Sequence, residues 1–122
     1  MLDYKILHKE KAVQTYRSGK HALDNDLPYA AYSMLKESVR ATLAYINEDL
    51  QGRTYSSKTN LKTLFNEVPA QLLESNTTDD FKIFLDLEKE GLPDILEASE
   101  EDLRKAQVTL KKIIGVYLGE SI

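Results

Sequence analysis

One stretch limits the possible folds of this chain more than any other, and it runs from Pro28 to Ile46. Proline suits the first position of a helix, because its missing N–H costs nothing there and its φ is already helical. Apolar residues then recur every three or four positions, at Tyr32, Leu35, Val39, Leu43 and Ile46. This spacing predicts a long amphipathic helix over 28–48.

The same stretch is rich in alanine, and its small side chains allow a neighbouring helix to approach closely. These residues are Ala30, Ala31, Ala41 and Ala44. Their neighbour would lie within the bundle or across a dimer. Tyr29 and Tyr32 are expected at a helix interface, because tyrosine combines a large apolar ring with a polar tip. The opposite face carries Ser33, Lys36, Glu37 and Arg40.

Two further long helices are predicted, over 5–23 and 99–118. The polar turn Asp24-Asn-Asp26 ends the first of them. In the second, Ser99 and Asp102 resemble a capping box, and Gly119 is a suitable stop. Its buried stripe is Leu103, Ala106, Leu110, Ile113, Ile114 and Tyr117.

Shorter elements fill the middle of the chain. Residues 51–59 are polar and lack a period, which predicts a loop. A short helix is expected over 61–68, capped by Thr59 or Asn60, and another begins near 76–80. Gly91 to Pro93 breaks the pattern, and no alternating run predicts a strand. We therefore expect an all-α fold, an up-and-down four- or five-helix bundle with short extra helices.

Composition restricts the class of protein. A length of 122 residues fits one domain, spanning 1–122. No cysteine is present, which excludes disulfides and thiolate metal sites and fits a cytoplasmic protein. The apolar runs are far shorter than the roughly 20 residues of a membrane span, so we expect no membrane association. No motif calls for a metal or a cofactor, and residues 86–97 match a calcium loop too poorly to bind one.

Charge is unevenly distributed along the chain. Residues 79–102 hold ten acidic residues against Lys82 and Lys89, whereas residues 103–122 hold four basic residues against Glu120. Broad binding of duplex nucleic acid is disfavoured, because it needs a basic stripe. A small basic pocket is compatible with this distribution.

The alanine-rich helix, the segment Asn60-Leu-Lys-Thr-Leu64 and the long final helix together resemble the HEPN family, named for higher eukaryotes and prokaryotes nucleotide-binding. Segments 28–46, 60–65 and 99–118 carry the likeness, which covers almost the whole chain. The resemblance implies a helical bundle that forms a homodimer. It also implies a nucleotide or RNA ligand and a nucleotidyltransferase partner, as in toxin–antitoxin pairs.

Ribonucleases of that family carry an arginine followed, after four to six residues, by a histidine, and no arginine here completes this motif. Arg17 precedes His21 by three intervening residues, one too few, and Arg53 reaches Asn60, whose amide cannot exchange a proton near neutral pH. The sequence thus favours a non-catalytic binding module. Two alternatives stay open: a metal-independent ribonuclease with an altered Arg/His site, and a structural adaptor whose acidic segment binds a basic partner.

Four basic residues are the candidate ligand-binding residues: Arg17, His21, Lys36 and Arg40. Each pair is spaced by one helical turn and so shares a face that could meet a phosphate. A solvated surface is the competing interpretation for both pairs. His8, the other histidine, is expected on the exposed surface as well, and no catalytic residue is assigned.

Overall fold

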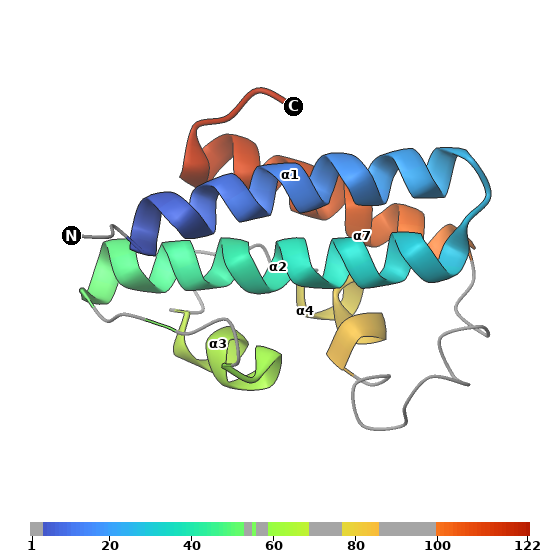
Figure 1. Cartoon of the computed structure of the whole chain (residues 1–122). Helices are drawn as coiled ribbons and strands as arrows, with labels where there is room; N and C mark the ends of the chain where they lie inside the picture. The colour runs from blue at the N-terminus through green and yellow to red at the C-terminus, as the bar shows by residue number, and fades with distance from the viewer. Residues whose placement is uncertain (1–3, 53–54, 56–58, 69–76, 86–99) are drawn as a thin grey trace.

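The computed structural model describes residues 4–52, 55, 59–68, 77–85 and 100–122. Its helices are α1 (Tyr4–Asp24), α2 (Pro28–Gln51), α3 (Leu61–Glu67), α4 (Thr77–Asp80) and α7 (Glu100–Ile113), followed by the π-helix η2 (Ile114–Leu118). Residues 82–85 are also helical, and these ranges contain no strand. The all-α helical bundle predicted from the sequence is confirmed (Figure 1).

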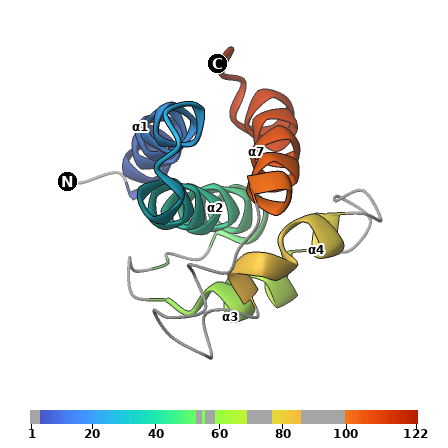
Figure 2. The ribbon, with the colours of Figure 1, turned by 90° about the vertical axis from the view of Figure 1, so that its right-hand side faces the viewer.

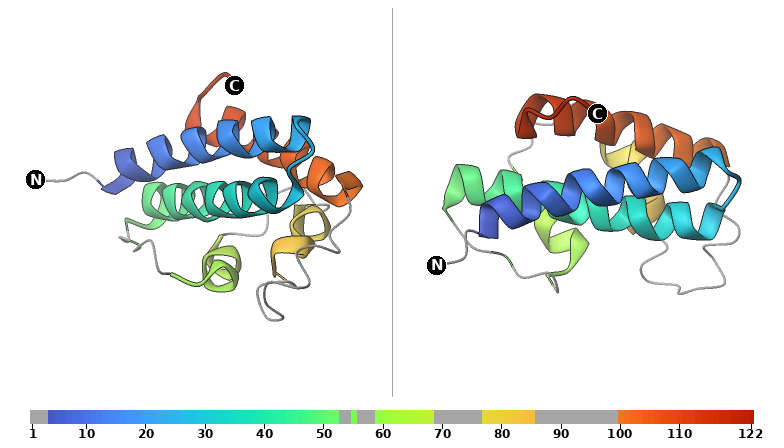
Figure 3. Two further views of the ribbon diagram at one scale, coloured as in Figure 1. Left: turned by 45° about the vertical axis from the view of Figure 1, so that its right-hand side comes forward. Right: turned by 45° about the horizontal axis from the view of Figure 1, so that its top comes forward.

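Helix α2 lies at the centre of the bundle. Its buried residues fall on more than one face and include four in succession, from Ala41 to Ala44. Helices α1 and α7 pack on one side of α2, with α1 antiparallel to it, while α3 and α4 lie on the other side (Figure 2). Figure 3 shows α7 running alongside the α1–α2 pair. A helix covered on both sides needs apolar or small residues nearly all round, which explains the alanines.

The predicted helix boundaries agree closely with the structure. Helix α1 begins and ends within one residue of the prediction, and α2 begins at Pro28 but runs to Gln51, three residues beyond it. Gly52 ends α2 with φ of 68°, a left-handed conformation that glycine adopts without steric cost. Gly119, with φ of 69°, follows the last helix as predicted, although that helix changes from α to π at Ile114.

The cap of the short helix α3 is Asn60, one of the two predicted residues. Its side-chain oxygen accepts a hydrogen bond from the backbone N–H of Lys62, at 2.8 Å. Thr59 has a different role, because its carbonyl accepts from Nε of Arg40 at 3.2 Å. The predicted break at Gly91–Pro93, the calcium-loop match, Arg53 and the cap at Ser99 lie outside the described residues.

Aromatic side chains pack the layer formed by α3 and α4 against α2. Tyr32 of α2 packs against Phe84 with ring centroids 5.4 Å apart, and Phe81 contacts both Phe84 and Phe65 at 6.2 Å. Phe81 and Phe84 are almost fully buried. Burial of such rings is among the largest apolar contributions a small domain can make, so this cluster holds α3 and residues 81–85 against α2.

The alanines of α2 are used within the bundle rather than left for a partner. Ala31, Ala41 and Ala44 are buried, and only Ala30 of the four is exposed. Tyr29 and Tyr32, both expected at a helix interface, differ in burial: Tyr32 is buried, whereas Tyr29 is 45% exposed. Close approach of neighbouring helices is thus an internal feature of this fold for three of the four alanines.

Candidate ligand-binding groove

A groove of about 760 Å³ runs along α7 where α4 packs against it. Its volume lies within the roughly 300–1,000 Å³ of typical small-molecule sites. The described residues that line it are Asp80, Glu100, Glu101, Arg104, Lys105, Val108, Thr109 and Lys112. The lining therefore combines three cations, three carboxylates, one hydroxyl and one apolar side chain, and all of them except Asp80 belong to α7.

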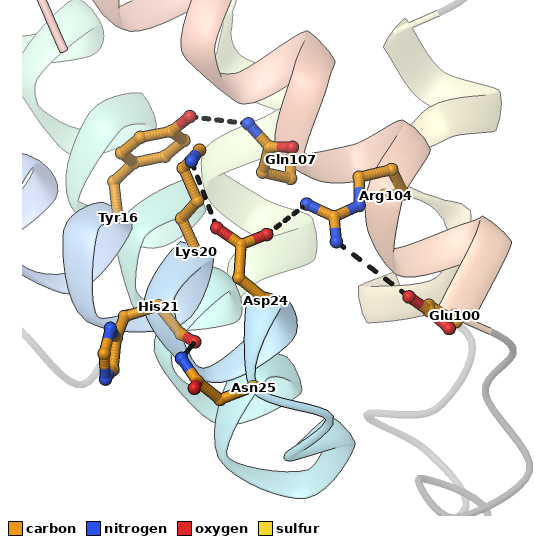
Figure 4. A network of polar contacts seen from close by, with 8 residues as sticks. All are labelled: Tyr16, Lys20, His21, Asp24, Asn25, Glu100, Arg104 and Gln107. Carbon is orange, nitrogen blue, oxygen red and sulfur yellow. Dashed lines mark hydrogen bonds and ion pairs between the residues drawn. The ribbon is translucent and has the colours of Figure 1, made fainter.

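A network of polar contacts fixes one end of this groove to α1 (Figure 4). Arg104 reaches Asp24 at 2.8 Å and Glu100 at 3.9 Å, and Lys20 reaches the other oxygen of Asp24 at 3.2 Å. The hydrogen bonds from Arg104 and then Lys20 hold the pKa of Asp24 below its usual value of 3.8. Arg104 is thereby held in place at the groove, with its guanidinium oriented by two carboxylates.

A buried hydrogen bond lies beside this network. The amide of Gln107 donates to the hydroxyl of Tyr16 at 2.6 Å, and both side chains are almost fully buried. Within the groove, the hydroxyl of Thr109 donates to Asp80 at 2.6 Å. The first bond joins α7 to α1 beside the groove, and the second joins α7 to α4 in the groove itself.

The lining offers several kinds of contact to a polar ligand. Ammonium and guanidinium groups bind phosphate oxygens, carboxylates accept hydrogen bonds from ribose hydroxyls, and the half-exposed Val108 offers apolar surface to a base. Within the described ranges, no three His, Asp or Glu side chains are grouped so that they could hold a metal ion. The charged and hydroxyl side chains of the groove offer ionic and hydrogen-bonding contacts to a ligand.

The first predicted pair, Arg17 and His21, is on the surface of α1. Both residues are exposed and one turn apart. Figure 4 shows the imidazole of His21 directed away from the Asp24–Arg104 ion pair. Arg17 lines a second, smaller groove beside Glu120, of about 470 Å³. Neither residue lines the larger groove at α7.

The second predicted pair, Lys36 and Arg40, lies on α2 and is partly buried. Arg40 contacts Glu37, three residues before it, and donates to the carbonyl of Thr59. The amine of Lys36 lies 5.9 Å from the ring centroid of Tyr32. Arg40 thus holds the chain that enters α3, a structural contact that competes with ligand binding by the same guanidinium.

The expectation that His8 is an exposed polar residue is wrong. Its side chain is only 11% exposed, and Nε2 lies 3.0 Å from the carbonyl oxygen of Tyr55. Glu48, 3.5 Å from the same nitrogen, accepts the backbone N–H of Tyr55. A carbonyl can only accept, so Nε2 of His8 carries a hydrogen. His8 thus makes a largely buried structural contact between α1 and Tyr55.

The groove residues of α7 were missed in the sequence, although a signal for them exists. Lys105, Val108, Thr109 and Lys112 follow i, i+3, i+4 and i+7 spacing and so share one helical face. The apolar stripe of the same helix is the more prominent pattern in the sequence, and this polar face is therefore easily overlooked. The carboxylate wall at Asp80 could not be found in this way, because only the packing of α4 on α7 brings it there.

Comparisons of this chain with protein-family models, with curated proteins and with solved structures give no match. The resemblance to the HEPN family therefore stays a prediction from the sequence. No helix in the described part of the chain combines the length and the apolar character that a membrane span requires.

Proposed function

We propose that this chain is a HEPN-like helical binding module that binds a nucleotide in the α4–α7 groove without transforming it. It acts as a homodimer, and the partner it serves is a nucleotidyltransferase, as the family resemblance implies. The single observation that carries the ligand class is the lining of the groove, where cations, carboxylates and an apolar side chain lie together.

The arrangement of charge supports a nucleotide over a simple anion. Glu100 and Glu101 lie on the same helix as Lys105 and Lys112, so a small anion would meet carboxylates as well as ammonium groups. A nucleotide separates its phosphate from its ribose hydroxyls by several ångströms. It can therefore place its phosphate near Lys112 and near Lys105, whose amine also lies 3.7 Å from Glu101, while its ribose hydroxyls donate to carboxylates.

The non-catalytic part of the proposal rests on the roles of the candidate side chains. His8 is held by Tyr55, Asn60 caps α3 and Arg40 holds Thr59. Arg17 and His21 are the exception, since both are exposed. They remain the pair to test for the ribonuclease alternative.

The test is calorimetric titration of the full chain with AMP, ADP, ATP and GTP. We expect a dissociation constant of about 1 mM or tighter for at least one of them, corresponding to about 4 kcal/mol. The double variant Lys105→Glu with Lys112→Glu should weaken that binding by about tenfold or more, because it reverses two charges that face the phosphate. Lys111→Glu is the matched control, since Lys111 is exposed on the same helix but does not line the groove.

Each outcome decides one part of the proposal. If none of the four nucleotides binds, or if Lys111→Glu weakens binding as much as the groove variant, nucleotide recognition in this groove is wrong. Incubation with structured and unstructured RNA tests the non-catalytic clause, and cleavage that is lost in Arg17→Ala with His21→Ala would establish the ribonuclease alternative instead.

A further inference from the structure

The outer face of α1 is an exposed surface with an unusual residue pattern. Ile6 is 55% exposed and Leu7 is 42% exposed, in a helix whose other face is buried against α2. Ile6, Val13 and Arg17 line the smaller groove of about 470 Å³. These two exposed side chains give the face some apolar surface that a docked molecule could cover.

The charge pattern of this face is complementary to that of a second copy of the same face. Glu10 and Arg17 are both exposed and line the groove, and they are seven residues, or about 10 Å, apart along the helix axis. Lys9 is 3.3 Å from Glu120, which offsets its charge locally. The face therefore carries negative charge toward one end and positive charge toward the other.

Two copies of such a face match when the helices are antiparallel. A two-fold axis between Val13 and Gln14 places Glu10 of each copy opposite Arg17 of the other, because the two residues are equidistant from the axis. Symmetry then produces the ion pair twice. The exposed amides of Gln14 meet near the axis, where each can donate to and accept from the other.

We propose that the outer face of α1 binds the same face of a second copy of this chain in antiparallel orientation, with Glu10 and Arg17 paired across the two-fold axis. This inference rests on the homodimer clause of the proposed function and names its surface. One helix face gives an interface near or below the lower end of the roughly 1,200–2,000 Å² of stable complexes. The dimer should therefore dissociate at micromolar concentrations and weaken with added salt.

The test is sedimentation velocity of the full chain over a range of concentrations. Arg17→Glu alone and Glu10→Arg alone each place like charges across the axis twice, so each should raise the dissociation constant by about tenfold or more. The double variant Glu10→Arg with Arg17→Glu exchanges the charges and should restore dimerisation. If the double variant restores the dimer, the weaker dimerisation of the single variants is not caused by unfolding. Circular dichroism checks the folding of each variant independently.

Two controls separate this surface from others. Lys62→Glu reverses an exposed charge on α3 and should leave the dimer unchanged. Tyr29→Glu disrupts the exposed apolar residues at the start of α2, and dissociation by this variant alone would overturn the proposal. A wild-type chain that stays monomeric overturns the homodimer clause and this inference together. A dimer insensitive to both charge reversals overturns the α1 surface only, and neither result affects nucleotide binding in the groove.

Discussion

Gly19 shows how much a single residue contributes to the packing of α1 on α2. It is buried in the C-terminal third of α1, and a Cβ atom built on it would lie 2.8 Å from two side-chain carbons of Leu35 and 3.1 Å from the Leu35 backbone nitrogen. Leu35 is fully buried and has little room to move. Glycine is needed here for close approach of the two helices.

Gly19→Ala should therefore destabilise the protein despite the better helix propensity of alanine. Propensity favours alanine by about 1 kcal/mol, whereas overpacking costs about 1–3 kcal/mol, so we expect a net loss of up to about 2 kcal/mol. Urea denaturation measures the change. Gly115→Ala is the matched control, because the nearest atom to its Cβ is 4.0 Å away and the site is exposed. A gain of stability at both positions would contradict the steric argument.

At the scale of the elements, α1 and α7 are joined by the buried hydrogen bond between Tyr16 and Gln107. Tyr16→Phe removes its acceptor and leaves the buried amide of Gln107 without its bond to Tyr16, which should cost about 1–3 kcal/mol. Adding Gln107→Leu removes the buried amide too, so the double variant should lose less than the sum of the two single losses. Strict additivity in a denaturant double-mutant cycle would exclude coupling between the two helices at this point.

Tyr55 is a second junction, since side chains from three helices hold it. His8 of α1 binds its carbonyl, Glu48 of α2 accepts its N–H, and its hydroxyl donates to Glu67 of α3. Glu48→Ala should cost about 1–3 kcal/mol, because it removes the acceptor of a largely buried backbone N–H. Glu48→Gln keeps an acceptor oxygen and should cost less. Equal losses of thermal stability in both variants would show that the hydrogen bond to Tyr55 does not matter.

For the whole molecule, the Asp24–Arg104 ion pair joins residues 80 positions apart in the sequence. The pKa of Asp24 in the folded protein is lowered by Arg104 and Lys20, so the unfolded chain takes up the proton first as pH falls. The stabilisation is therefore fully present above pH 3.8 and is lost as pH falls through the folded pKa.

Asp24→Asn should accordingly reduce thermal stability near neutral pH and have no effect at the lowest pH at which the protein stays folded. The loss should be small and should shrink in high salt, because the pair is well exposed. Melting temperatures of both proteins from pH 7 down to about pH 2 measure it, a range that brackets the reference pKa of an aspartate. A difference that grows as pH falls would contradict the sign of the pKa shift.

The helices and their ends were predictable because their causes are local. Pro28 fixes a helix start, Asn60 caps α3, and Gly119 ends the last helix, each through its own backbone geometry or a neighbour within a few residues. The change from α-helix to π-helix at Ile114 was not predicted, because the apolar stripe of the final helix continues through it. Spacing along a single helix places the candidate ligand residues on one face, but it gives no information on what lies opposite that face.

Local sequence patterns were enough to predict an all-α bundle and to place the ends of its three long helices within three residues where the structure describes them. The spacing of apolar residues by three and four positions is a property of a single helix, and it can be read directly from the sequence. Only the packing of the helices brings His8 into a largely buried contact with Tyr55, Gly19 against Leu35, and Asp80 into one groove with Lys105 and Lys112. Those contacts join residues far apart in the chain, and their distances depend on how the helices pack rather than on any local pattern.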